Sequence, residues 1–406
     1  MSGAIVVTIL TLLLGIQPVT TDLYLPALPM LQSQLGTSVA GAQSTLSVLI
    51  ICFGFSQLLC GPLSDRFGRR PVLLAGLALY TVAAVGSATV SSIAGLIAWR
   101  ALQGVAMAAA VTCGRGVIRD LFEPAEGARV MSRALTGLGV IAVAAPLCGG
   151  VIVEAFGWHA ALLALAVFGA VALAVVGLRF VETVPAKNAD ATRPSHVLRN
   201  WRVVVGDPTF RAWAALSAAT YGGLYCMLAG SSFVFIGVLG VGRAEYGAIL
   251  ASMSVAYIGG TFLCRRLLRR HGLRGAVARG ACFSLAGGVG LVALSAGGVQ
   301  TVWAILLPQY LYAIGHGIHQ PCGQAGAVGP FPEKAGTAAS LSGFAMTLSA
   351  LAAGLWLGLT LDGTAYPMMF AIGTFSVALA LVAWTVVQRH GEPARAAPLA
   401  ALPRLA

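Results

Sequence analysis

The chain has 406 residues, of which 58% are hydrophobic and only 9% are charged. Soluble domains carry about 25% charged residues, so this composition excludes a soluble globular protein and indicates an integral membrane protein. The formal net charge is +12. In a membrane protein we expect such an excess in the loops on one side of the bilayer, and not in a surface for nucleic acid.

Apolar runs separated by polar breaks predict twelve membrane-spanning helices, because about 20 apolar residues cross a bilayer. The first six are expected near 4–31, 40–62, 71–90, 93–117, 127–154 and 159–180. The second six are expected near 210–238, 245–268, 274–295, 299–325, 335–361 and 365–388. The predicted fold class is therefore an all-α integral membrane protein with two sets of six helices.

The first predicted helix contains a carboxylate, Asp22, followed by Pro26 and Pro29. An ionised Asp at the centre of a membrane helix costs about 2.5–3.5 kcal/mol. Arg100, in the helix near 93–117, is expected at a similar depth, so pairing with it or a watery cavity would relieve that cost. The prolines are expected to loosen the outer end of the helix. Alternatively, the outer part of 20–31 is a cap outside the membrane.

The sequence GPLSDRFGRR at 61–70 closes the second helix, and Pro71 suits the first turn of the third. The stretch GTFLCRRLLRRHGLRGAV at 260–277 occupies the matching place in the second half, without the acid. Two halves with a shared loop pattern predict a duplicated transporter whose site lies at the midplane between them.

The stretch 182–208 is the only long polar segment, so it is predicted as a linker. The predicted domains are a six-helix bundle at 1–181, a cytoplasmic linker at 182–208, a second bundle at 209–390 and a cytoplasmic tail at 391–406.

The positive charges predict the orientation in the membrane. With the N-terminus inside, 23 of the 25 Lys and Arg fall in inner loops and helix ends, Arg243 falls outside and Arg100 lies within a helix. This distribution of positive charge predicts that both termini are cytoplasmic.

The helix near 299–325 carries His316 and His319 on one face, with Gln320 beside them. A His pair can bind a metal or relay protons, but no third ligand is evident nearby. We therefore predict a polar cavity wall and no metal. The eight cysteines are scattered through apolar segments and are expected to act as small hydrophobes.

Five stretches of the sequence resemble a known family. GPLSDRFGRR is similar to motif A of the major facilitator superfamily, and RALQG at 100–104 is similar to its motif B. APLCGG at 145–150 resembles the antiporter motif C, with Ala145 in place of a typical glycine. DLYLPALP at 22–29 and RGVIRDLFE at 115–123 resemble drug–proton antiporters of the bicyclomycin/chloramphenicol-resistance (Bcr/CflA) type.

The resemblance implies a major facilitator fold, with two pseudo-symmetric bundles, that exports amphipathic drugs across the inner membrane in exchange for protons. We expect no enzyme activity, because the widely separated acids offer no catalytic cluster, and we expect no cofactor and a monomer in the lipid bilayer. A proton- or sodium-coupled uptake carrier for a small metabolite is the alternative. A Walker A pattern is absent, which disfavours ATP coupling.

The predicted site residues fall into four groups. Proton coupling is assigned to Asp22 and Arg100. The substrate cavity is assigned to Tyr24, Gln103, Tyr221, Tyr225, His316, His319 and Gln320. A charge network that closes the cytoplasmic side is assigned, by resemblance to motif A, to Gly61, Asp65, Arg66, Gly68, Arg69, Arg70 and Asp120. The antiporter motif is assigned to Pro146, Gly149 and Gly150.

Overall fold

The computed structural model describes residues 3–122, 124–184, 187 and 189–392, and every regular element in them is a helix. The first half of the chain contains α1 (Gly3–Asp22), η1 (Leu25–Ala27), α2 (Leu28–Gln34), α3 (Val39–Phe67), α4 (Arg69–Thr89), α5 (Ile93–Leu121), α6 (Pro124–Phe156) and α7 (Trp158–Arg179). The predicted tail lies outside the described residues from 393 onward.

The linker contains α8 (Pro194–Gly206), a helix that was not predicted from the sequence. The second half contains α9 (Pro208–Ser232), η2 (Phe233–Val238), α10 (Arg243–Ala296), α11 (Val302–Val328), η3 (Pro332–Lys334), α12 (Ala335–Thr360), α13 (Tyr366–Leu381), η4 (Val382–Val386) and α14 (Val387–His390).

Ten helical segments in the described part of the chain are long and apolar enough to cross a bilayer. One of them is α10, which Gly272 breaks into two arms with φ 65° and ψ −173°. α11 is not among the ten; it carries several polar side chains, including Gln309, His316 and Gln320. Counting both arms of α10 and adding α11 gives the twelve predicted spans and confirms the all-α membrane fold.

Local sequence explains where several helices begin. Ser38, Ser92 and Thr301 each accept a backbone N–H three residues ahead, at 3.1–3.2 Å. Asp207 accepts the backbone N–H groups of Thr209 and Phe210, and Pro208 opens α9 behind it. Such caps satisfy N–H groups that have no partner within the helix.

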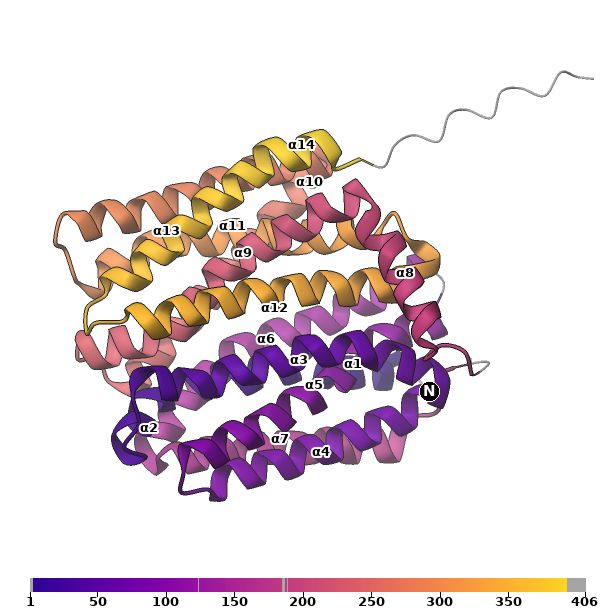
Figure 1. The fold of residues 1–406 in the computed structure, drawn as a ribbon, viewed down its shortest axis with the longest axis horizontal. Helices are drawn as coiled ribbons and strands as arrows, with labels where there is room; N and C mark the ends of the chain where they lie inside the picture. Colours follow the sequence, from indigo (N-terminus) through magenta and orange to yellow (C-terminus); the bar gives the residue numbers. More distant parts are fainter. Residues whose placement is uncertain (1–2, 123, 185–186, 188, 393–406) are drawn as a thin grey trace, which may run out of the picture.

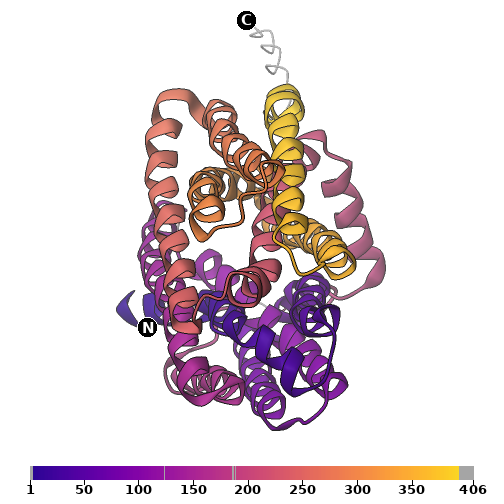
Figure 2. The same cartoon turned by 90° about the vertical axis from the view of Figure 1, so that its left-hand side faces the viewer.

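The helices form two groups that lie one above the other in both views (Figures 1 and 2). Helices of the first half lie below, and those of the second half lie above. α8 crosses one end of the molecule, the end at which α1 begins and α14 lies (Figure 1). We call this end the linker end and the opposite end, where α2 lies, the far end.

The buried apolar side chains form two clusters. The larger contains first-half residues such as Leu25 and Leu49 together with second-half residues such as Phe235 and Met368. The smaller lies almost wholly in the second half, around Trp213 and Ile318, with Leu58 as its first-half member. A continuous apolar core therefore joins the two halves.

Candidate functional site

A cavity of about 740 Å³ lies between the two halves and reaches the linker end. Its walls carry uncharged polar side chains from three helices of different halves: Gln17 of α1, Gln57 of α3, and Gln320 and Gln324 of α11. Tyr221 of α9 completes this polar lining. A cavity of this size accommodates a drug-sized molecule.

Charged and aromatic groups line the same cavity toward the linker end. Asp65 and Arg69 contribute from the first half, and Glu333 and Lys334 contribute from the second. The linker helix α8 adds side chains that include Trp201. The linker helix is thus part of the cavity wall and does more than connect the two halves.

The far end is closed by close contact between backbones. A Cβ at Gly149 would collide with the backbone of Leu23, and a Cβ at Gly150 would collide with the backbone of Arg243. Gly247 of α10 approaches the Pro146 carbonyl in the same way. Only residues without a side chain allow α6 and α10 to cross this closely.

Polar contacts also join the halves away from the linker end. The Gln43 amide donates to the Ala229 carbonyl at 3.2 Å, and the Ser47 hydroxyl lies 3.2 Å from that of Tyr225. Glu154 of α6 accepts the backbone N–H of Ala244, in the first turn of α10, at 2.7 Å. A carboxylate at a helix N-terminus is favourable because it meets unpaired N–H groups and the positive end of the dipole.

Asp22 is the last residue of α1, where the first membrane helix is interrupted. Pro26 lies in η1 and Pro29 lies in the first turn of α2, so the prolines stand at the predicted break. Asp22 is partly buried and accepts the Thr21 hydroxyl at 2.7 Å. Tyr221 and Tyr246, which belong to the second half, lie close enough to Asp22 for an electrostatic interaction.

Arg100 is fully buried inside the first half. It donates to Gln103 Oε1 at 2.6 Å and to the Thr20 carbonyl at 3.3 Å, and its guanidinium carbon lies 4.2 Å from the centroid of the Tyr24 ring. Thr20 and Tyr24 flank Asp22 in sequence, so Arg100 lies at the depth of Asp22.

Of the two expected ways to relieve the cost of the Asp22 charge, pairing with Arg100 is not seen, since no ion pair joins the two in the described structure. The reason is helical geometry. Asp22 is two residues from Thr20, or about 200° around the helix, so its carboxylate points away from the side that Arg100 contacts. Arg100 does not line the cavity; its guanidinium is directed at partners within the first half.

Five of the seven predicted cavity residues do not line the cavity. Tyr24 and Gln103 pack around Arg100, with the Tyr24 hydroxyl 2.7 Å from that of Thr45. Tyr225 is held at the interface by Ser47. Of the predicted seven, Tyr221 and Gln320 do line the cavity.

The two histidines are buried inside the second half, which corrects the predicted cavity wall. His316 Nδ1 lies 2.9 Å from the Thr220 hydroxyl, and His319 Nε2 lies 3.2 Å from the Val277 carbonyl. Each ring therefore forms a hydrogen bond with a neighbouring helix, His316 with α9 and His319 with α10. Among the described residues, no three His, Cys, Asp or Glu side chains come together as a metal site requires.

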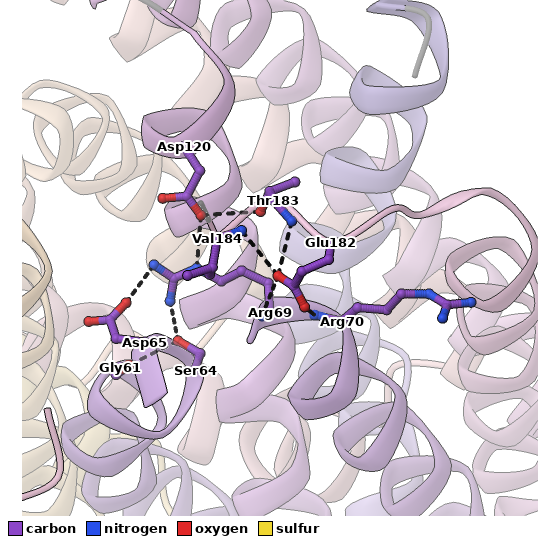
Figure 3. A network of polar contacts seen from close by, with 9 residues as sticks. All are labelled: Gly61, Ser64, Asp65, Arg69, Arg70, Asp120, Glu182, Thr183 and Val184. Carbon is purple, nitrogen blue, oxygen red and sulfur yellow. Dashed lines mark hydrogen bonds and ion pairs between the residues drawn. The ribbon is translucent and has the colours of Figure 1, made fainter. Parts of the chain in front are cut away.

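The motif A loop forms a charge network at the linker end (Figure 3). Arg69 lies 2.7 Å from Asp65 and 3.0 Å from Asp120, and it also donates to the Ser64 hydroxyl. Its side chain is only 3% exposed, so these contacts are shielded from water on the arginine side. Arg69 thus ties the end of α3 to the end of α5.

Glu182 completes this network and was missed by the sequence analysis. Its carboxylate accepts the backbone N–H groups of Arg69 and Arg70, which open α4, at 2.9 and 3.1 Å (Figure 3). It also accepts those of Thr183 and Val184 at 3.0 and 3.1 Å. Burial disfavours its charged form, but these four bonds outweigh burial and hold the pKa of Glu182 below its usual value.

The remaining motif A residues have other contacts. Arg66 donates to the Thr192 hydroxyl of the linker at 2.5 Å, which corrects its predicted place among the acids. Arg70 donates to the Gly177 carbonyl at 3.1 Å. Gly61 lines the cavity, and Gly68 turns the chain between α3 and α4 with φ 104°, a conformation that favours glycine.

A polar cavity between two six-helix halves, open at one end and closed at the other, defines a membrane transporter of the alternating-access class. The chain belongs to the Major Facilitator Superfamily, whose family model matches residues 10–354. This membership points to a multi-pass membrane transporter and not to an enzyme.

Curated relatives match most of the chain, two of them over nearly its full length. A bicyclomycin resistance protein homolog of Haemophilus influenzae is 27% identical over 96% of this chain and 98% of its own. Multidrug resistance protein D of Escherichia coli is 28% identical over 95% of this chain and 97% of its own. A chloramphenicol resistance protein of Pseudomonas aeruginosa is 28% identical over 78% of this chain and 74% of its own.

Solved structures share the fold. A bacterial homolog of the human lysosomal transporter Spinster, in an inward-facing and occupied conformation, aligns with a TM-score of 0.73 at 15% identity, covering 96% of this chain and 98% of that one. A D-xylose–proton symporter aligns with a TM-score of 0.72 at 15% identity, covering 97% and 100%. At this identity the likeness concerns the fold alone.

Proposed function

We propose that this protein exports amphipathic drugs across the inner membrane in exchange for protons. The observation that carries the proposal is the set of relatives named for bicyclomycin, multidrug and chloramphenicol resistance, the first two of which align over nearly the full chain. The cavity supports it, because its size and its mixed polar and apolar lining suit molecules of that kind.

The two halves, 1–181 and 209–390, would rock about the cavity as rigid domains joined by the linker 182–208. The present structure represents the state in which the cavity opens at the linker end. The described contacts of Arg69 join α3 and α5 of the first half. In the opposite state, this network would meet the second half and hold the linker end closed.

Asp22 is the best candidate for the proton site. Its carboxylate is partly buried at the break of the first helix, within electrostatic range of Tyr221 and Tyr246 on the other half. Rocking of the halves changes those neighbours, so proton affinity would depend on conformation. Arg100 would act through the helix that carries Asp22, because it touches neither the cavity nor the carboxylate.

The proposed orientation places both termini and the linker end in the cytoplasm, because the arginine-rich loops lie on that side. The open end of the cavity would then receive substrate from the cytoplasm or the inner leaflet, as an exporter requires. A membrane-impermeant reagent should label a cysteine at Asn200 in inside-out vesicles only. Labelling in right-side-out vesicles would show that the protein has the opposite orientation.

A cell experiment tests the export proposal. The protein is expressed in bacteria that lack their own drug exporters, and accumulation of chloramphenicol is followed with and without a protonophore. Export predicts lower accumulation that the protonophore abolishes. Higher accumulation in expressing cells would instead identify an uptake carrier, and a panel of related compounds would then define the substrate.

A further inference from the structure

Four arginines near the end of the first arm of α10 form what we call the arginine patch: Arg265, Arg266, Arg269 and Arg270. All four side chains are exposed. None has a carboxylate partner among the described ion pairs, and the sequence contains no Asp or Glu from 246 to 332. Within the part of the chain that the structure describes, the patch therefore has no ion-pair partner.

The spacing of the patch increases its repulsion. Arg265 and Arg269 are four residues apart, as are Arg266 and Arg270, so like charges stand one turn above each other on the helix. Arg274, beyond the break at Gly272, differs because it pairs with Glu392 at 2.6 Å. An external anion would relieve the repulsion that the chain itself leaves.

The helix surface that leads to the patch is exposed and apolar. Val255 is 58% exposed and Phe262 is 60% exposed. Val255, Phe262, Arg266 and Arg269 follow each other at steps of seven, four and three residues, so they lie on one stripe of the helix. The guanidinium of Arg265 lies beside this stripe, 4.8 Å from the centroid of the Phe262 ring.

We propose that this stripe binds an anionic phospholipid, with the phosphate on the arginine patch and an acyl chain along Phe262 and Val255. The order of the stripe, apolar and then basic toward the helix end, matches the order of acyl chain and headgroup in a leaflet. Basic clusters at the end of a membrane helix attract anionic headgroups. The apolar half of the stripe favours a lipid over a free phosphate or a nucleic acid.

The first half of the chain offers a contrast at the matching loop. There Arg69 is neutralised by Asp65 and Asp120. The second half keeps the arginines of the repeated loop but lacks the acid. The lipid phosphate would thus take the place of the carboxylates and brace the second half against the membrane surface.

The test measures lipid binding directly, so it is independent of transport. Full-length protein in detergent is titrated with phosphatidylglycerol, and bound lipid is counted by native mass spectrometry. Arg266→Gln/Arg269→Gln should bind about 25-fold more weakly, at roughly fivefold for each arginine lost. Phe262→Ser, which keeps the charge, should also weaken binding. Zwitterionic phosphatidylethanolamine should bind weakly to every variant.

The matched control is Arg199→Gln/Arg202→Gln, which removes two exposed arginines from α8 and should leave binding within about threefold. Equal losses in both double variants would overturn the proposal by showing general charge attraction. Displacement of the lipid by millimolar inorganic phosphate, or an unchanged affinity in Phe262→Ser, would identify a soluble-anion site instead. Thermal unfolding without lipid confirms that each variant is folded.

Discussion

Thr20 and Tyr24 lie on one side of the first membrane helix, and Asp22 lies on the other. Arg100 binds the first side through the Thr20 carbonyl and the Tyr24 ring. The Thr20 hydroxyl also lies 2.6 Å from that of Tyr80. Because Thr20 is near the C-terminus of α1, its carbonyl is one that a helix leaves without an internal partner. Arg100 therefore holds the helix end, while Asp22 stays free to face the second half.

Replacing Asp22 by Asn keeps the size of the side chain but removes the proton. The variant should insert and bind substrate, because the surrounding contacts of α1 are unchanged. It should lose gradient-driven transport and should release no protons when drug is added in detergent. Asp362→Asn, at an exposed loop position, is the control and should behave as wild type. Proton release from Asp22→Asn at the wild-type level would remove Asp22 from the mechanism.

Replacing Arg100 separates its positioning role from its charge. Arg100→Lys keeps the charge but cannot reach Gln103 and Thr20 while stacking on Tyr24. We expect about 2 kcal/mol lower stability for Arg100→Ala, since hydrogen bonds to a buried charge are lost, and a smaller loss for Arg100→Lys. Thermal unfolding in detergent gives the stabilities. A positioning role also predicts an altered pH dependence of transport, and two variants with the wild-type pH profile would contradict it.

At the scale of elements, each end of the transporter uses a carboxylate at the start of a helix. Glu182 meets the N-terminus of α4 at the linker end, and Glu154 meets that of α10 across the halves. The helices that cross at the closed end do so through glycine, so their separation is fixed by backbone contact. These features are local, yet they decide which end of the cavity is closed.

The α6–α10 crossing can be tested with one methyl group. A Cβ at Gly150 would meet backbone atoms of Ala244 and Gly247 at 3.0 and 3.2 Å. Overpacking costs about 1–3 kcal/mol, so Gly150→Ala should disfavour the closed far end. A cysteine at Gln324, in the cavity, should then react about tenfold more slowly from the linker side. The control Gly139→Ala on the same helix meets only an ordinary contact with Ile258 at 3.6 Å, and equal effects of both variants would contradict the account.

Glu182 predicts a pH dependence of stability. Its folded pKa lies below the usual value, so its contribution is present at neutral pH, above the pKa of the unfolded chain. The contribution is lost as the pH falls through the lower, folded pKa. Glu182→Gln should lower stability by about 1 kcal/mol at neutral pH, as the loss of a helix cap does. The stability difference between wild type and Glu182→Gln should shrink as the pH falls. A difference that grows in acid would contradict the lowered pKa of Glu182.

At the scale of the molecule, the sequence predicted the twelve helices because each apolar run is long enough to cross a bilayer. It did not predict α8, since the apolar residues of HVLRNWRVVV form a run that is short and interrupted by arginines, within a linker that is otherwise polar. It placed Arg100 at the right depth but on the wrong side, because depth follows from residue count whereas facing depends on packing. Glu182 was missed because its partners are backbone N–H groups, which leave no mark in a sequence.

The same reasoning explains the histidines. His316 and His319 on a membrane helix have the same pattern whether they face a cavity or a neighbouring helix. The structure turns them toward Thr220 and Val277. The polar lining comes instead from glutamines spread over α1, α3 and α11, which only the assembled bundle brings together.

Proton-coupled export is tested by the exchange of drug for protons by purified protein in liposomes. In the first measurement, chloramphenicol is added outside the liposomes while a pH dye reports the pH of the lumen. In the second, the drug starts at equal concentrations on both sides and a pH gradient is imposed. Antiport predicts that drug and protons move in opposite directions and that the gradient concentrates the drug. Movement of both in the same direction, or drug equilibration at a rate that ignores the gradient, would contradict proton-coupled export.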